Sequence, residues 1–405
     1  RKLISIQKKI FHKFLKTAIK TLDYQINQKV FSAIAGAYTN YFIDFFVYYY
    51  FLSSNLNTPK KKIYFKFNIE HEMSYFMKVS QNKEFLLYVI NCIKYRIYSS
   101  KLKNNNININ INLIELKLNL ENKNLKKKNT EIFFHETRHA NLIAQFANKN
   151  IDILNKNSFK SFKTKILKKN DNLRNIFNQN FKPKNEIEKN FLLFFNDFFS
   201  TLFFESIIKN LNYFQKKIKY YPKQILTNNH AWFSNDEFKY YLGLQALRSS
   251  KIIDFQINFS THLTSHNPHI QVASKFSDEI VLWINQKIGL KKNVLYLPSL
   301  YFADIQENNS VKTNNISEIL YFGCGISKYF KGFWSSYISG GCLAEYLNNS
   351  YEFLSNVEHK NIKLLKFRIR IDTFFTRKIS VKNKIKKIFN LAATNGIYNL
   401  LLRII

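Results

Sequence analysis

The chain has 405 residues, which is enough for two or three domains with a sizeable core. It carries 62 Lys and Arg residues against 27 Asp and Glu residues, and this net charge of +35 is far beyond what solubility requires and indicates a polyanionic partner. The cysteines Cys92, Cys324 and Cys342 are scattered, which argues against a disulfide framework and against a paired-cysteine metal site.

Two apolar runs have to be distinguished from membrane spans. The run at residues 41–52 is too short to cross a bilayer, and the run at residues 191–208 is interrupted by Asn196, Asp197 and Glu205. Both runs therefore predict buried helices, and we expect no membrane insertion.

The first half of the chain predicts helices mixed with strands and basic connectors. In residues 104–120 Ile107, Ile109 and Ile111 alternate with Asn, which favours a strand over a disordered low-complexity segment. Residues 156–190 are polar and basic, which predicts a surface connector or a tail that follows RNA.

Residues 135–139 read HETRH, the His-Glu-x-x-His pattern that zinc peptidases carry on a helix. A zinc site needs a third protein ligand, and residues 140–149 contain no His, Cys, Asp or Glu. Arg138 also places a cation between the two histidines. We interpret the motif as a polar helix face, with a zinc metallopeptidase as the remote alternative.

After residue 230 the hydrophobic pattern becomes more regular. Ser234 and Glu237 form a capping box for a helix over residues 235–248, and residues 253–259 alternate as a strand. Pro268 is expected to open a long helix that ends near Gly289. The residues of this helix that should face the core are Ile270, Ala273, Phe276, Ile280, Ile284 and Ile288.

The carboxy-terminal residues predict two further strands. Residues 365–372 alternate, with Lys366, Arg368 and Arg370 on one face, and arginine beside lysine on a strand favours contacts with phosphates. Residues 396–405 predict a last, largely buried strand.

Four segments then occur in a characteristic order: residues 256–288, KGFWSSYISGGCLAEY at 331–346, FRIRID at 367–372 and ATNGIYNLLLRII at 393–405. Their order and spacing resemble small-subunit ribosomal protein three of the bacterial and organellar type, over about residues 230–405. The positions in which the family's motifs correspond are Lys331, Gly332, Ser339, Gly340, Ala344, Glu345, Arg368, Ile371, Asp372, Thr394 and Gly396.

The resemblance implies a scaffold in the head of the small ribosomal subunit, beside the channel where messenger RNA enters. A basic pair on a helix of the family corresponds to Lys291 and Lys292, while the family's third basic position is Leu295 here. The candidate RNA-binding residues are Lys291, Lys292, Lys331, Lys366, Arg368, Arg370 and Arg377.

Two departures from the family stand out. The chain has no Gly-x-x-Gly loop, with which a KH domain clamps nucleotides, and has HAWFSNDEF where this loop would precede the helix. The family's amino-terminal segment is also not found. Either residues 1–225 are a lineage-specific replacement, or a separately encoded chain supplies the missing half and packs against an open edge of the strand at 253–259.

We therefore expect an α+β fold in three parts: a basic, helix-rich extension with some strands at 1–225, a degenerate KH-like remnant at 226–262, and a carboxy-terminal domain with a mixed sheet at 263–405. The expected function is that of a structural, non-enzymatic constituent of the small ribosomal subunit in the mitochondrial matrix, with a plastid as the alternative location. The expected partners are rRNA, messenger RNA and the head proteins ten and fourteen of the subunit. No catalytic residue, metal or cofactor is expected, and the alternative is an organellar RNA-binding factor outside the ribosome.

Overall fold

The computed structural model describes residues 2–56, 65–98, 117–118, 125–134, 137–147, 151–255, 268–282, 293–297, 319–323, 349, 352 and 365–369. The chain divides into two compact units, residues 1–308 and 309–405. In the second unit β7 (Ile319–Gly323) and β8 (Leu365–Ile369) pair in parallel. The elements below belong to the first unit.

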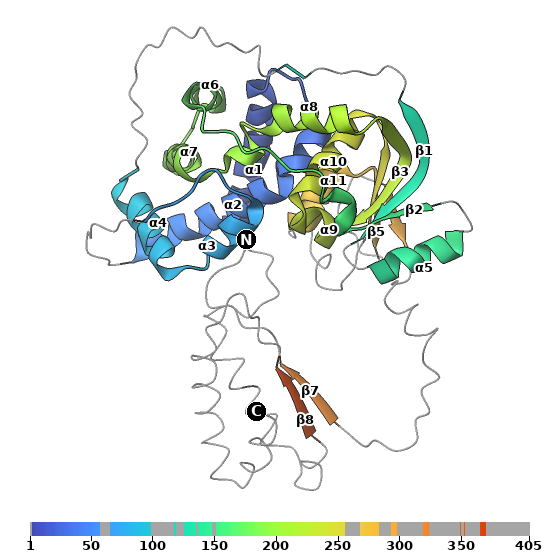
Figure 1. Ribbon diagram of the computed structural model, residues 1–405. Helices are drawn as coiled ribbons and strands as arrows, with labels where there is room; N and C mark the ends of the chain where they lie inside the picture. Colours follow the sequence, from blue (N-terminus) through green and yellow to red (C-terminus); the bar gives the residue numbers. More distant parts are fainter. Residues whose placement is uncertain are drawn as a thin grey trace. The chain divides into compact units, whose positions relative to one another are not determined.

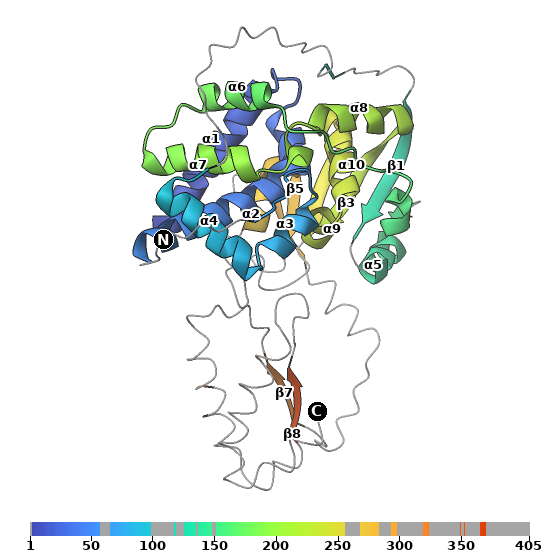
Figure 2. The ribbon, with the colours of Figure 1, turned by 60° about the vertical axis from the view of Figure 1, so that its left-hand side comes forward.

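A group of helices lies at one side of the sheet (Figures 1 and 2). It contains α1 (Lys2–Thr21), α2 (Gln28–Asn55), α3 (Met73–Val79), α4 (Lys83–Tyr95), α6 (Asp171–Phe181) and α7 (Glu186–Phe198). Their shared core is aromatic, and Phe14 is at its centre, with its ring within 6.3 Å of those of Phe31, Phe177, Phe191, Phe195 and Phe199. Tilted and edge-on ring contacts of this kind add specificity to the burial of apolar area.

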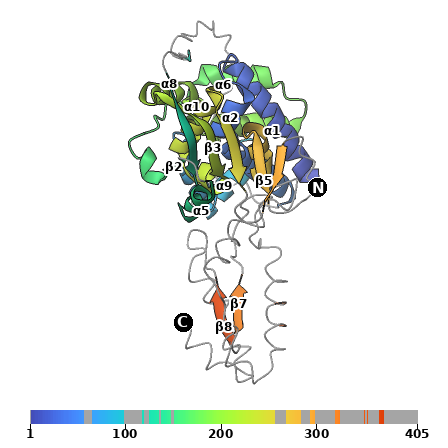
Figure 3. The same cartoon turned by 90° about the vertical axis from the view of Figure 1, so that its right-hand side faces the viewer.

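Six parallel strands form the sheet, in the order β2-β1-β3-β4-β5-β6 (Figure 3). The strands are β1 (Lys126–Phe133), β2 (Ile151–Leu154), β3 (Tyr220–Asn228), β4 (Lys251–Phe255), β5 (Glu279–Leu282) and β6 (Asn293–Tyr296). The chain moves outward from β1 to β2, then returns to the other side of β1 for β3. This reversal of direction is typical of doubly wound sheets.

Helices cover both faces of the sheet. On one face α5 (Thr137–Ala147) contributes Ala140 to a cluster with Ile132, Leu226, Ile253 and Val281. On the other face lie α9 (Asn229–Ser234), α10 (Asp236–Leu247) and α11 (Pro268–Phe276). The rows of apolar residues therefore run on both faces, as expected for a buried parallel sheet.

The long helix α2 connects the helical group to the sheet, because it packs against both α10 and α11. At the crossing with α10, a Cβ atom on Gly243 would lie 2.4 Å from Cγ1 of Ile34, so the two helix backbones come close only because position 243 is glycine. Over its 28 residues α2 is long and apolar enough to span a membrane, but its most apolar window is entirely buried in the protein.

The fold confirms several predictions from the sequence. The α+β class is confirmed as a mixture of helices and strands, and the apolar runs at 41–52 and 191–208 lie in buried segments that are mostly helical. The helix at 235–248 is α10, although its cap is Asn235, whose side chain accepts a hydrogen bond from the backbone N–H of Phe238, rather than Ser234.

Other predictions are wrong. The helix from Pro268 ends at Phe276 instead of near Gly289, and Ile280 lies in β5. Every strand pair that the structure describes is parallel, and most of residues 263–405, for which the sequence predicts a mixed sheet, lie outside the described residues. Residues 156–190 are not only a connector, because they contain α6, which buries Leu173 and Phe177.

The expected open edge is also wrong for residues 253–255, the part of the strand at 253–259 that the structure describes. β4 pairs with β3 on one side and with β5 on the other, so a partner chain has no edge to join there. The sheet takes strands from all three segments that the sequence suggested as separate parts. The predicted strand at 104–120 lies outside the described residues except for residues 117–118, and the predicted strand at 396–405 lies wholly outside them.

One acidic side chain lies inside the sheet. Asp254 of β4 is fully buried, and its Oδ1 accepts a hydrogen bond of 2.8 Å from Nε1 of Trp232 in α9. Burial raises the pKa of this carboxyl group to about 7, since a charge is poorly solvated there.

This pKa predicts how stability depends on pH. The unfolded chain releases the Asp254 proton near pH 4 and the folded chain near pH 7, so the free energy of unfolding should fall between these values by an amount on the order of 4 kcal/mol. The variant Asp254→Asn has no carboxyl group at this position, so its free energy of unfolding should not show this decrease. Urea unfolding of both proteins at pH 4, 5.5, 7 and 8 measures the difference, and parallel curves would contradict the assignment.

Candidate nucleic-acid interface

Residues 162–170 form an extended segment that lies alongside the start of α8 (Ile207–Lys217). The segment belongs to no helix or strand. The buried Asn210 holds it, because its Oδ1 accepts from the backbone N–H of Lys165 at 2.7 Å and its Nδ2 donates to the Lys165 carbonyl at 2.9 Å. Oγ of Ser206 accepts from the backbone N–H of Leu167 at 2.9 Å. Side chains of the helix thus satisfy backbone groups that would otherwise need a neighbouring strand.

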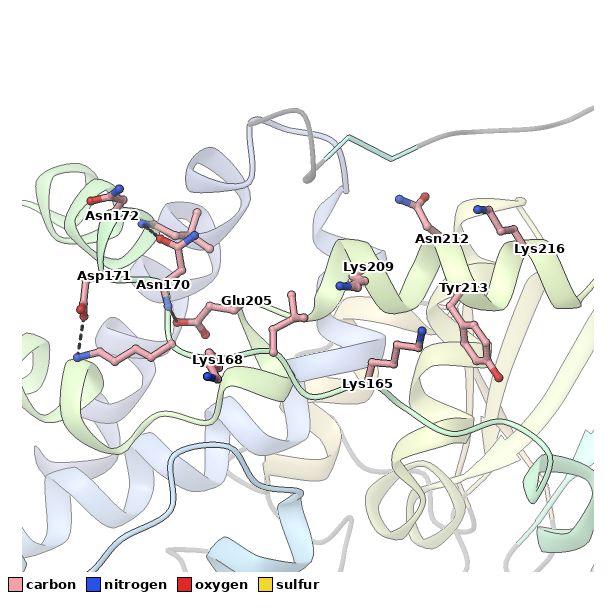
Figure 4. Close-up of a pocket in the computed structure, with 13 residues that line it drawn as sticks. Lys165, Lys168, Asn170, Asp171, Asn172, Glu205, Lys209, Asn212, Tyr213 and Lys216 are labelled. Carbon is pink, nitrogen blue, oxygen red and sulfur yellow. Dashed lines mark hydrogen bonds and ion pairs between the residues drawn. The ribbon is translucent and has the colours of Figure 1, made fainter. Parts of the chain in front are cut away.

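A pocket of about 960 Å³ opens between this segment, α6 and α8 (Figure 4). Its size is at the upper end of the range for small-ligand sites, roughly 300–1,000 Å³. Five of the residues that line it are lysines: Lys165, Lys168, Lys169, Lys209 and Lys216. The pocket therefore gathers positive charge from two parts of the chain about 40 residues apart.

The two carboxylates of the pocket are both already paired. Oδ1 of Asp171 lies 3.0 Å from Nζ of Lys169, and Glu205 pairs with the buried Arg174. Within the described part of the chain, the four other lysines have no carboxylate partner. These four ammonium groups are exposed around one pocket, so they make the local potential positive and favour an anion there.

A buried ion pair between Arg174 and Glu205 supports one side of the pocket. Their side chains are 1% and 2% exposed, and Nε of Arg174 donates to Glu205 at 2.6 Å. Arg174 also donates to the carbonyl oxygens of Phe195, Asn196 and Phe199 at 2.8–3.0 Å. Oε1 of Glu205 in turn accepts from the backbone N–H of Asn170. The pair therefore fixes the place where the lysine segment turns into α6.

An aromatic ring lies at the other end of the pocket. Tyr213 of α8 is half-buried, and Nζ of Lys165 and of Lys217 lie 5.7 Å and 6.0 Å from its ring centre. Figure 4 shows the Lys165 ammonium group pointing toward this ring. Lysine beside a half-exposed aromatic face is the combination that binds a phosphate and stacks a base.

The basic surface continues from α8 to the first strand. The backbone N–H of Lys126 donates to the Lys219 carbonyl at 3.2 Å, and Nζ of Lys128 lies 3.9 Å from the ring centre of Tyr220. Lys126, Lys127, Lys217 and Lys219 are exposed. A polyanion bound at the pocket would meet further lysines along this path.

The residues predicted from the sequence are not those of the pocket. Lys366 and Arg368 lie in β8, opposite Leu320 and Phe322 of β7, and as alternate residues they share one face of the strand. Five of the predicted residues lie outside the described residues: Lys291, Lys292, Lys331, Arg370 and Arg377. The helix expected to end near Gly289, just before Lys291 and Lys292, ends at Phe276.

The HETRH motif is only partly described. His139 is buried within α5, which begins at Thr137, while His135 and Glu136 lie outside the described residues. Among the residues that the structure describes, no three His, Cys, Asp or Glu side chains are grouped as metal ligands.

The sequence held one signal for the pocket, in residues 156–190. Their basic character indicated RNA, but Asn170, Asp171 and the spacing of Leu173, Phe177 and Phe181 also mark a capped amphipathic helix. The lysines of α8 carried no comparable signal, because lysine is frequent along the whole chain.

Comparisons with known protein families, with curated proteins and with solved structures find no match to this chain. A functional conclusion therefore depends on the chemistry of its own residues.

Removal of the Arg174 side chain should be costly. In Arg174→Met the carboxylate of Glu205 loses its buried cation, and we expect the free energy of unfolding to fall by about 3–5 kcal/mol. The double variant Arg174→Met/Glu205→Gln should lose less than the two single variants together, because it leaves no unpaired buried charge. Urea unfolding measures all four proteins, and a loss below about 1 kcal/mol for Arg174→Met would contradict this role.

Proposed function

We propose that the chain is a structural, non-enzymatic RNA-binding protein of the small ribosomal subunit in mitochondria. The observation that carries the proposal is the group of four exposed lysines without a carboxylate partner in the described structure, around a pocket that also exposes a tyrosine ring. The net charge of +35 supports the same class of partner.

The chemistry of the pocket favours a nucleic acid over an acidic protein. Ammonium groups on flexible side chains act as point charges that suit phosphates in many orientations. An acidic peptide needs no stacking surface, whereas an unpaired nucleobase does, and Tyr213 offers one beside Lys165. Asn170, Asn172 and Asn212 add amides at the rim of the same pocket.

The ribosomal part of the proposal comes from the resemblance of residues 230–405 to small-subunit ribosomal protein three. By this resemblance the partners are rRNA in the subunit head, proteins ten and fourteen, and messenger RNA at the channel where it enters. The role of Lys291 and Lys292 at that channel is a proposal from sequence alone, since neither residue is among those the structure describes.

Removal of pocket lysines should weaken RNA binding. In the triple variant Lys165→Ala/Lys168→Ala/Lys209→Ala, three phosphate contacts are lost, so the slope of log K against log salt should fall by about 2 and affinity at ~0.15 M salt by roughly tenfold or more. Filter binding to a small-subunit rRNA fragment measures both. The matched control is Lys66→Ala/Lys78→Ala/Lys83→Ala, which changes the net charge equally at exposed positions around α3 and α4. Equal losses in the two triple variants would refute a specific RNA site at the pocket.

A sedimentation experiment distinguishes the ribosomal hypothesis from the alternative, an RNA-binding factor outside the ribosome. A structural constituent should remain stoichiometric with the small subunit through a gradient at several hundred millimolar salt, because phosphate contacts and buried apolar area act together. Release to the top of the gradient would exclude the ribosomal assignment and leave the general RNA-binding role.

A further inference from the structure

The charges of the pocket are unevenly distributed. Lys165, Lys209 and Lys216, which have no carboxylate partner in the described structure, lie near Tyr213 at one end of the pocket. Lys168 lies with the paired carboxylates Asp171 and Glu205 toward the other end, at the start of α6 (Figure 4). A phosphate is attracted more strongly to the first end, because the carboxylates at the second end each neutralise a cation.

This distribution restricts how an RNA strand can lie. A strand that ran straight through the pocket would bring a phosphate next to the ion pair of Asp171 and Lys169, which has no net positive charge to attract it. A strand that enters and leaves at the end near Tyr213 does not pass this ion pair, but its backbone has to turn within the pocket. The backbone then stays near the lysines, and the base at the turn points inward.

The ring of Tyr213 is placed to receive such a base. It is half-buried on the pocket wall and has a lysine near it on the segment and another on α8, so its exposed surface adjoins the positions where phosphates would bind. The bases of a continuous duplex are stacked inside the helix and do not reach a pocket wall. Only an unpaired nucleotide places a base there.

We infer that the pocket binds a single unpaired nucleotide at a sharp turn of the RNA backbone, such as a bulge, with its base stacked on Tyr213 and its flanking phosphates near Lys165, Lys209 and Lys216. This inference rests on the proposed RNA-binding function and specifies the form of RNA at the same site. It assigns Tyr213 the selection of unpaired RNA and the lysines the sequence-independent affinity.

The test compares two RNA hairpins of equal length, one fully paired and one with a single-nucleotide bulge. The full-length protein should bind the bulged hairpin more tightly, and Tyr213→Leu should lower its affinity for that hairpin by about 5- to 150-fold, the usual range for one base stacked on an aromatic ring. Affinity for the paired hairpin should stay the same. Tyr213→Phe is the control, because it keeps the ring and should keep the preference.

A fluorescent 2-aminopurine base at the bulge gives an independent readout on the unchanged protein. Stacking on Tyr213 should quench its emission on binding, and Tyr213→Leu should remove the quenching. Equal affinity for the two hairpins, or a bulge preference and quenching that survive in Tyr213→Leu, would overturn the inference while the RNA-binding function stands. Lack of any lysine-dependent RNA binding would instead refute the proposed function itself.

Discussion

The guanidinium group of Arg174 is the interaction on which the arrangement of the helical group and of the lysine pocket depends. It is nearly inaccessible to solvent, and it donates hydrogen bonds to both oxygens of Glu205 and to three backbone carbonyl oxygens around the end of α7. A buried guanidinium is tolerated only when its donors are satisfied, so α6, the end of α7 and the start of α8 have to meet in one geometry. The segment that carries Lys165 and Lys168 is attached to this junction and takes its position from it.

The need to pair buried charges also determines where the many lysines of this chain lie. Inside the described structure, ionic groups are balanced locally: Arg174 by Glu205, and Lys239 of α10 by Asp236. The carboxyl group of Glu131 is buried against the hydroxyl of Tyr241, and burial raises its pKa. The excess of lysine is therefore at the surface, where mutual repulsion favours the binding of a polyanion.

The sequence predicted those elements whose own residues specify them. The apolar residues of α2 and α7 and the polar residues before α10 are local signals, and the structure contains these helices, although Asn235 caps α10 instead of the predicted Ser234. The helix from Pro268 shows the limit of such signals, because Ile280, Ile284 and Ile288 continue a helical period that the folded chain does not follow. The helix ends at Phe276, shortly before Asp278. The backbone N–H of Asp278 donates to the Ile252 carbonyl, and its carboxylate accepts from the Ile252 N–H and from Lys29. These partners come from β4 and α2, so their effect cannot be read from residues 268–289 alone.

The candidate pocket could not be predicted from the sequence for a similar reason. Its walls come from residues 165–173 and 205–216, and they are joined by the contacts of Asn210, Ser206 and Glu205. With lysine common everywhere in the chain, neither wall stood out by composition. The positions taken from the family resemblance instead lie mainly outside the described residues, and only Lys366 and Arg368 have a place in the described sheet of the second unit.

The order of the strands also affects how the chain is made. Lys126 of β1 pairs with Tyr220 of β3, so two neighbouring strands of the sheet are joined by a connection of more than 80 residues. During synthesis β1 leaves the ribosome long before β3 exists, and at about 5–20 residues per second it waits several seconds or more for its central partner. Pairing of such distant segments is slow because a long loop has to close first. The lysines at the start of β1 give the waiting strand a charged end, which opposes its association with other nascent chains.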